Sequence, residues 1–302
     1  MGYVIRSSGR HQIGLAALAA GVFGLSSAPL ELQRHIVDDA IKSGTAEKIV
    51  WLAIAYAAVA LIEQTLKLAL NIYRSWVSET SVRALRKTLR EVDGGESLQG
   101  KENDETGTHA AMIVAEVEPI GGFVGIAISE PLMQVGILVS VIGYMAYLEP
   151  WTLLLSLGYL GPQMLFVPPM QQAINRRAAA RICTVRRVGG DIVEQGVPEG
   201  ERIDRIFELN MGIYKIKFSM NLAMNFMHYL AVAVALGVGG LFVLDHRIEI
   251  GTVVAVASGL GKLNDPWGDL VNWGRELSVD SVKYRLFAEA LRRGAKPPFG
   301  AS

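Results

Sequence analysis

The sequence predicts an all-α integral membrane protein with six long transmembrane helices and two helical hairpins outside the bilayer. Two observations support this fold class. First, the 302-residue chain is 51% hydrophobic and only 19% charged, whereas soluble domains average about 25% charged residues. Second, four stretches contain no Asp, Glu, Lys or Arg, namely 13–30, 131–148, 150–175 and 218–244. Each stretch reaches the ~18 residues that a helix needs to cross a bilayer.

Two further segments are apolar but interrupted by charged residues. The first contains Glu63 and Lys67, and the second contains Lys262, Asp265 and Asp269. A secretory signal peptide does not fit the N-terminal apolar stretch, because the stretch is too long and no small-residue cleavage site follows it. We therefore expect six spans, at about 12–32, 49–74, 120–148, 150–175, 218–244 and 250–274.

Basic residues flank the expected spans on one side of the membrane. The short loops on the other side, "LEPW" and "DHRIE", carry few or balanced charges. By the positive-inside rule, both termini and the two long loops are expected in the cytoplasm. The expected membrane is the plasma membrane, which is the inner membrane in a bacterium. The basic residues that set this orientation are Arg6, Arg10, Arg83, Arg86, Lys87, Arg90, Arg176, Arg177, Arg181, Arg186, Arg187, Lys283, Arg285, Arg292 and Arg293.

The two long loops have the composition of helices. The region 49–91 contains no Pro or Gly, and as one helix it would be roughly 64 Å long, about twice the ~30 Å hydrocarbon core. We expect cytoplasmic helical hairpins at about 75–119 and 176–217, with Gly- and Pro-containing tips at 93–107 and 189–200. Two ordinary soluble loops are the alternative. The whole chain, 1–302, is expected to form a single transmembrane domain.

Polar residues inside the expected spans recur every three or four residues, as Glu63, Lys67, Asn71 and Arg74 do, which places them on one face of each helix. Charged side chains are costly in a bilayer and normally face a bundle interior or a watery cavity. Local neutralisation is the alternative, in which Glu63 pairs with Lys67 and Lys262 pairs with Asp265. His228 also fits an interior, hydrogen-bonded histidine. The residues expected to line a hydrated substrate path are Glu63, Lys67, Asn71, His228, Lys262, Asp265 and Asp269.

Several functional classes are disfavoured by composition. The net charge is zero, which argues against nucleic-acid binding. The single cysteine, Cys183, cannot form an internal disulfide. No His, Cys, Asp or Glu cluster has the spacing of metal ligands, and no catalytic residue is expected. Gly121 and Gly125 form a small-xxx-small pattern, which favours a close contact between helices.

Three segments resemble the transmembrane domain of ABC exporters, the type-1 or type IV fold. They are "PLELQRHIVDDAI" at 29–41, "TGTHAAMIVAEVEPI" at 106–120, and "RIEIGTVVA" at 247–255 with "LNDPWGDLVNWGRELSVDSVKYRLFAEAL" at 263–291. The resemblance extends from Ile13 to Leu291. The chain departs from the family at Glu116, where Asp is usual, and in "VPEGERIDRI" at 197–206.

This resemblance implies an ATP-driven exporter subunit in which two transmembrane domains, identical or different, enclose a central cavity. Nucleotide-binding partners would dock on coupling helices near 102–111 and 191–200. The chain has no GxxxxGK[ST] or LSGGQ-like motif, so ATP and Mg²⁺ are expected on a partner nucleotide-binding domain or subunit. The residues that the resemblance assigns to coupling are Glu102, Asn103, Asp104, Glu105, Asp191, Glu194 and Gln195.

Two other functions stay open at this point. One is an ATP-independent secondary carrier, in which Glu63, Asp265 or His228 would carry a proton. The other is a membrane scaffold of the same fold that does not transport.

Overall fold

The computed structural model describes residues 2–42, 45–93, 117–195 and 200–294, and these residues are helical apart from short turns. Within this described part, five helical regions are long and apolar enough to cross a membrane. The protein is therefore a helical, multi-pass membrane protein. The elements are α1 (Gly2–Leu25), α2 (Ala28–Ile41), α3 (Ala46–Asp93), α5 (Ser129–Leu148), α6 (Trp151–Gln195), α7 (Gly200–Leu244) and α8 (Ile250–Gly294), with a further helical stretch at 117–126.

The five candidate spans do not match the six expected ones in every respect. They cover Ser8–Ile41, Ala46–Lys87, Val117–Leu148, Trp151–Val185 and Gly200–Leu244. The sixth expected span, 250–274, lies in the helix α8 but is not among them, because its charged residues lower its mean hydropathy. A membrane-spanning role for α8 stays a prediction.

Proline residues interrupt two of the expected spans. The first, 12–32, contains a turn at Ser26 and Ser27, where the Ser26 N–H donates to the Phe23 carbonyl oxygen at 3.2 Å. Pro29 lies in the first turn of the next helix, α2. The expected span at 120–148 is interrupted in the same way, by a turn at 127–128 before α5. Proline has no N–H to donate to the preceding turn and disfavours helical geometry in the residue before it, so a new helix begins at each site.

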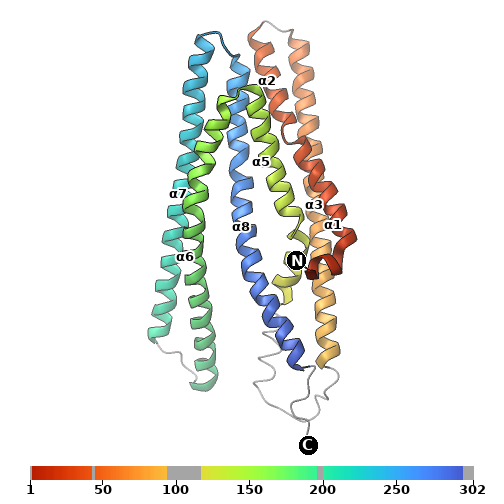
Figure 1. Cartoon of the computed structure of the whole chain (residues 1–302), viewed down its shortest axis with the longest axis vertical. Coiled ribbons are helices and arrows are strands. Elements are labelled where there is room, and N and C mark those ends of the chain that lie inside the picture. Colours follow the sequence, from red (N-terminus) through yellow and green to blue (C-terminus); the bar gives the residue numbers. More distant parts are fainter. Residues whose placement is uncertain (1, 43–44, 94–116, 196–199, 295–302) are drawn as a thin grey trace, which may run out of the picture. The chain divides into compact units, whose positions relative to one another are not determined.

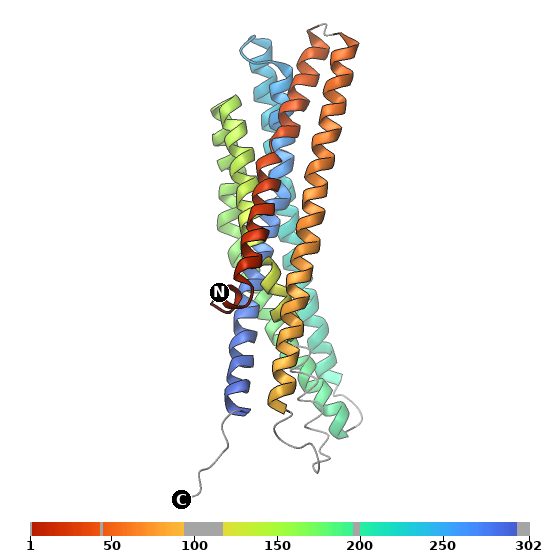
Figure 2. The same cartoon turned by 90° about the vertical axis from the view of Figure 1, so that its right-hand side faces the viewer.

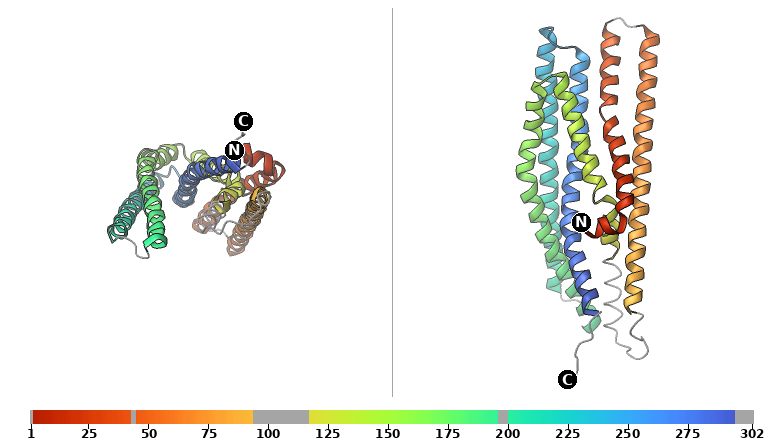
Figure 3. Two further views of the ribbon diagram at one scale, coloured as in Figure 1. Left: turned by 90° about the horizontal axis from the view of Figure 1, so that it is seen from below. Right: turned by 45° about the vertical axis from the view of Figure 1, so that its right-hand side comes forward.

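The chain divides into two compact units, one formed by 1–141 with 265–302 and the other by 142–264. In the first unit, α1 and α2 pack along α3, as Figure 2 shows. Leu15, Ala19 and Val22 of α1 are fully buried in this contact region, as is Leu70 of α3. The first turns of α1 point away from the rest of the helix (Figure 3), and Ser8 has the non-helical angles φ −140° and ψ 20° where they meet.

In the second unit, α6 and α7 pack against each other as an antiparallel pair (Figure 1). Each contains 45 residues, and thus measures about 68 Å, more than twice the hydrocarbon thickness. α6 contains Pro162, Pro168 and Pro169 within its length, whereas α7 contains no proline.

The expected tip of the second hairpin is wrong in its first half. α6 continues through Gly189 and Gly190 to Gln195, and α7 begins at Gly200. A glycine costs a helix only about 1 kcal/mol relative to alanine, so two of them lower its stability without ending it. The tip expected at 93–107 lies outside the described residues, apart from the last residue of α3 at Asp93.

Candidate functional site

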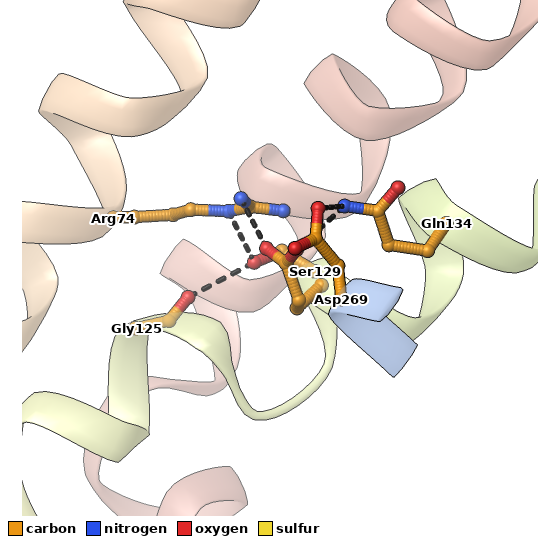
Figure 4. Close-up of polar contacts among 6 residues, drawn as sticks. Arg74, Gly125, Ser129, Gln134 and Asp269 are labelled. Carbon is orange, nitrogen blue, oxygen red and sulfur yellow. Dashed lines mark hydrogen bonds and ion pairs between the residues drawn. The ribbon is translucent and has the colours of Figure 1, made fainter. Parts of the chain in front are cut away.

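A buried polar network joins α3, α5 and α8 in the first compact unit (Figure 4). Arg74 of α3 donates from Nε to Ser129 Oγ at 2.8 Å and pairs through Nη1 with Glu130 Oε2 at 2.5 Å. Gln134 Nε2 donates to Glu130 Oε1 at 2.7 Å and to Asp269 Oδ2 of α8 at 2.9 Å. The network therefore joins one guanidinium directly to the Glu130 carboxylate, and the Gln134 amide links that carboxylate to the carboxylate of Asp269.

Close packing of two helices places the arginine against this network. The Ser129 hydroxyl donates to the Gly125 carbonyl oxygen at 2.9 Å, and Ser78 of α3 donates to the Gly122 carbonyl oxygen at 2.7 Å. A Cβ atom at Gly125 would overlap the Arg74 carbonyl oxygen, and one at Gly121 would overlap Val82, about two turns further along α3. The close contact predicted from these two glycines is confirmed, and its partner is α3.

The charges of the network are largely shielded from water. The side chain of Arg74 is 7% exposed and that of Glu130 is 16% exposed, and Ser129 and Gln134 are buried. Asp269 is exposed in the isolated chain, so one end of the network reaches the surface. Arg74 Nη2 is buried and has no hydrogen-bond partner among the described residues. The network contains two carboxylates, Glu130 and Asp269, and one guanidinium, Arg74. Its net charge is therefore negative when both carboxylates are ionised.

Such an arrangement has defined chemical capacities. An isolated charge inside a bilayer is expensive, so intramembrane ionisable residues are paired and are functional-site candidates by default. The surplus carboxylate can accept a proton or attract a cation. The unused Nη2 of Arg74 can donate up to two more hydrogen bonds, for example to water or a polar ligand.

Two of the expected path residues form a local ion pair. Lys67 Nζ lies 2.8 Å from Glu63 Oε1, one helical turn away, and their side chains are 34% and 6% exposed. This is the local neutralisation that the spacing allowed. Asn71, on the same predicted stripe, is exposed. Lys262 belongs to the other compact unit, so its expected meeting with Glu63 stays a prediction.

His228 lies in an aromatic cluster of the second unit. Its ring is 5.9 Å from the ring of Tyr159 in an edge-on arrangement, and Tyr159 Oη donates to Asn264 Oδ1 at 3.1 Å. The His228 Nδ1 atom is buried and has no hydrogen-bond partner within the described ranges. Of the remaining expected residues, Lys262 is half-buried and Asp265 is exposed.

The expected coupling residues are placed only in part. Glu102, Asn103, Asp104 and Glu105 lie outside the described residues. Asp191, Glu194 and Gln195 lie in the last turns of α6, and the described part does not include their side chains. Their proposed role therefore stays a prediction.

The sequence indicated two of the five side chains of the network and missed the other three. Arg74 and Asp269 stand on the polar stripes of their helices, but Glu130, Gln134 and Ser129 were not expected there. A usable signal was the spacing of Glu130 and Gln134, which are four residues apart at the start of a charge-free stretch.

One carboxyl group beyond the expected sixth span is perturbed. Burial raises the pKa of Glu276 above its usual value, Arg275 lowers it, and the carboxylates of Asp280 and Glu130 raise it further. Among the described residues, no group of three or more His, Cys, Asp or Glu side chains is arranged to hold a metal ion.

Comparison with protein-family models gave no match to this chain, and comparison with curated proteins gave none either.

Proposed function

We propose that this chain is the membrane-spanning subunit of an ATP-driven exporter of the ABC type. Two copies, or one copy and a related chain, would enclose the substrate path, and partner nucleotide-binding domains would supply ATP and Mg²⁺. Both termini and the long helical extensions would lie in the cytoplasm, with the chain in the plasma membrane. The resemblance in the segments 29–41, 106–120 and 247–291 supports this assignment.

The structural observation that carries the proposal is the length of four helices. α3 has 48 residues, and α6, α7 and α8 have 45 each. At 1.5 Å per residue they measure about 68–72 Å, whereas the hydrocarbon core is ~30 Å thick. More than half of each helix therefore lies beyond the apolar core. Continuous helices of this length can carry a displacement from a partner outside the membrane to side chains inside it.

The apolar exterior of α3 supports assembly with a second chain or with lipid. Only 6% of the most apolar 18-residue stretch of α3 is buried against other described residues. Trp51, Leu61 and Ile72 are among its exposed apolar side chains. In the proposed assembly, these residues contact lipid or the second transmembrane domain, and the network around Arg74 forms part of the polar wall of the path.

The first experiment asks whether an ATPase accompanies the chain. The tagged full-length chain is purified from membranes of its natural host in mild detergent, and Mg²⁺-dependent ATP hydrolysis is measured in the purified material. The test variant replaces all four residues at 102–105 by alanine. The control variant, Asp245→Asn with Glu249→Gln, alters the same kind of charge in the opposite loop.

The proposal expects an ATPase to copurify with the unaltered chain and the control, and to be lost from the test variant. If no ATPase accompanies the unaltered chain, and its transport follows a proton gradient while ignoring ATP depletion, the ATP-driven assignment is overturned.

A proton-coupled secondary carrier is the second candidate, and the buried network is the observation that favours it. Glu130 and Asp269 are linked through Gln134, and Arg74 is their cation. Paired intramembrane carboxylates are typical of proton relays. In a carrier, Glu130→Gln would abolish gradient-driven uptake. In an ATP-driven exporter, the same variant would leave ATP hydrolysis in the complex. A scaffold that does not transport would show neither activity.

A further inference from the structure

A basic groove lies between α6 and α7 in the second compact unit. It has a volume of about 640 Å³ and extends from Ala173 to Ala180 on α6 and from Arg205 to Gly212 on α7. Its charged lining consists of Arg176, Arg177 and Arg205 against a single acid, Glu208. The groove is separate from the network around Arg74, which belongs to the other unit.

Two of these arginines are available for a ligand. Arg205 Nη1 is 3.0 Å from Glu208 Oε2, so the charges of these two residues offset each other. Within the described ranges, Arg177 donates only to the carbonyl oxygen of Ala173, at 3.5 Å. Arg176 makes no hydrogen bond or ion pair with the described residues, and both side chains are exposed. The groove therefore presents two adjacent guanidinium groups whose charge no carboxylate of the described chain offsets.

A glycine opens the groove on the side of α7. A Cβ atom at Gly212 would lie 3.0 Å from Arg177 Nε and 3.1 Å from its Cδ. The missing side chain lets the arginine stem lie against the α7 backbone. A larger residue at this position would compete with the arginine for the same space.

The position of the groove along the helices indicates the source of the ligand. Arg176 directly follows the charge-free stretch 150–175 of α6, and the groove ends on α7 six residues before the charge-free stretch 218–244. Six helical residues span about 9 Å, so this end of the groove lies near the outer edge of one headgroup layer, which is roughly 5–8 Å thick. Long basic side chains at this level can extend toward the interface.

We infer that this groove binds the phosphate group of an anionic membrane lipid through Arg176 and Arg177. Guanidinium groups bind phosphate oxygens with paired hydrogen bonds, and basic pockets between helices at the cytoplasmic interface suit lipid headgroups. A soluble anion would have the same phosphate chemistry, but the level of the groove beside the apolar stretches favours a lipid. The inference requires a membrane protein and is independent of ATP coupling.

The test measures lipid binding to the purified full-length chain by native mass spectrometry. Phosphatidylglycerol is compared with phosphatidylcholine, which has the same chains and no net charge. The test variant is Arg176→Gln with Arg177→Gln. Each basic residue near the surface strengthens binding to an anionic lipid about fivefold, so this double variant is expected to bind phosphatidylglycerol roughly thirty-fold more weakly.

A matched control removes the same charge elsewhere. Arg83→Gln with Lys87→Gln changes two exposed basic residues of α3 that have no described partner, and it is expected to lower affinity by less than threefold. A second variant, Gly212→Leu, keeps every charge but fills the groove, and is expected to weaken lipid binding while the helical circular dichroism is unchanged.

Three outcomes would overturn the inference. Equal losses in the test and control variants would indicate general attraction to a positive surface. Full binding by Gly212→Leu would place the lipid outside the groove. Displacement of phosphatidylglycerol by excess inorganic phosphate, with phosphate retained in its place, would assign the site to a soluble anion.

Discussion

Replacing Arg74 by methionine is the sharpest test of the buried network. The change keeps an unbranched side chain of similar length and removes the charge together with the bonds to Ser129 and Glu130. Two membrane hydrogen bonds at an average of ~0.6 kcal/mol each would account for a loss of only about 1 kcal/mol. Removing one partner of a buried ion pair, however, typically costs about 3–5 kcal/mol, because the remaining charge is left buried.

The structure favours the larger value for Arg74→Met. Its partner Glu130 has a side chain that is only 16% exposed, so water does not replace the lost cation. We expect the free energy of unfolding to fall by about 3 kcal/mol. It is measured by titrating the protein from mild detergent into SDS and following helical circular dichroism. Arg83→Met, an exposed position on the same helix, is the control and should change it by less than about 0.5 kcal/mol.

A second substitution separates charge from packing. Glu130→Gln removes the carboxylate that Arg74→Met leaves unpaired, so the double variant should be more stable than the sum of the single losses predicts. The expected coupling is at least about 1 kcal/mol. Losses that add within ~0.5 kcal/mol, or an Arg74→Met variant as stable as the control, would show that the pair does not interact in the folded membrane protein.

Three further predictions concern other parts of the chain. Gly125→Ala should lower the free energy of unfolding by about 1–3 kcal/mol, since its Cβ overlaps the α3 backbone. The control Gly122→Ala, where a Cβ meets open space, should leave this free energy unchanged. Equal thermal unfolding midpoints for the two variants would refute the close contact. Lys67→Met should cost about 1–2 kcal/mol in the SDS titration, since it removes a partly exposed cation from the buried Glu63 carboxylate. The double variant with Glu63→Gln should regain most of this loss, and a loss as large as that at Arg74 would contradict the exposure argument. Cys183 is exposed and expected in the cytoplasm, so a membrane-impermeant maleimide should label it in inside-out vesicles but not in intact cells. The variant Cys183→Ser is the unlabelled control. Labelling in intact cells instead would show that the predicted orientation is wrong.

The sequence predicted helices well because apolar length and missing helix breakers are local properties. It predicted α3 as one continuous helix, and the structure confirms this from Ala46 to Asp93. The turns before α2 and α5 were missed, because each falls inside or beside a charge-free stretch whose length alone suggested one span. Pro29 and Pro131, which lie in the first turns of these helices, were the available signal.

The polar network could be predicted only in part for a different reason. Helical spacing shows which residues share a face of one helix, as it did for Arg74 and Asp269. It does not show which face of another helix lies opposite. Glu130 and Gln134 meet Arg74 and Asp269 only through contacts between residues 55 or more positions apart, which no local pattern encodes. By contrast, Glu63 and Lys67 are neighbours on one helix, and their pairing followed from spacing alone.

The three prolines of α6 make this helix easier to bend than its neighbour α7. Pro162, Pro168 and Pro169 remove three amide donors within eight residues, and α7 loses none. At that level, α6 has a lower bending stiffness than the uninterrupted rod beside it. A force applied to the ends of α6 and α7 that lie furthest from these prolines would therefore bend α6, while α7 stays straight.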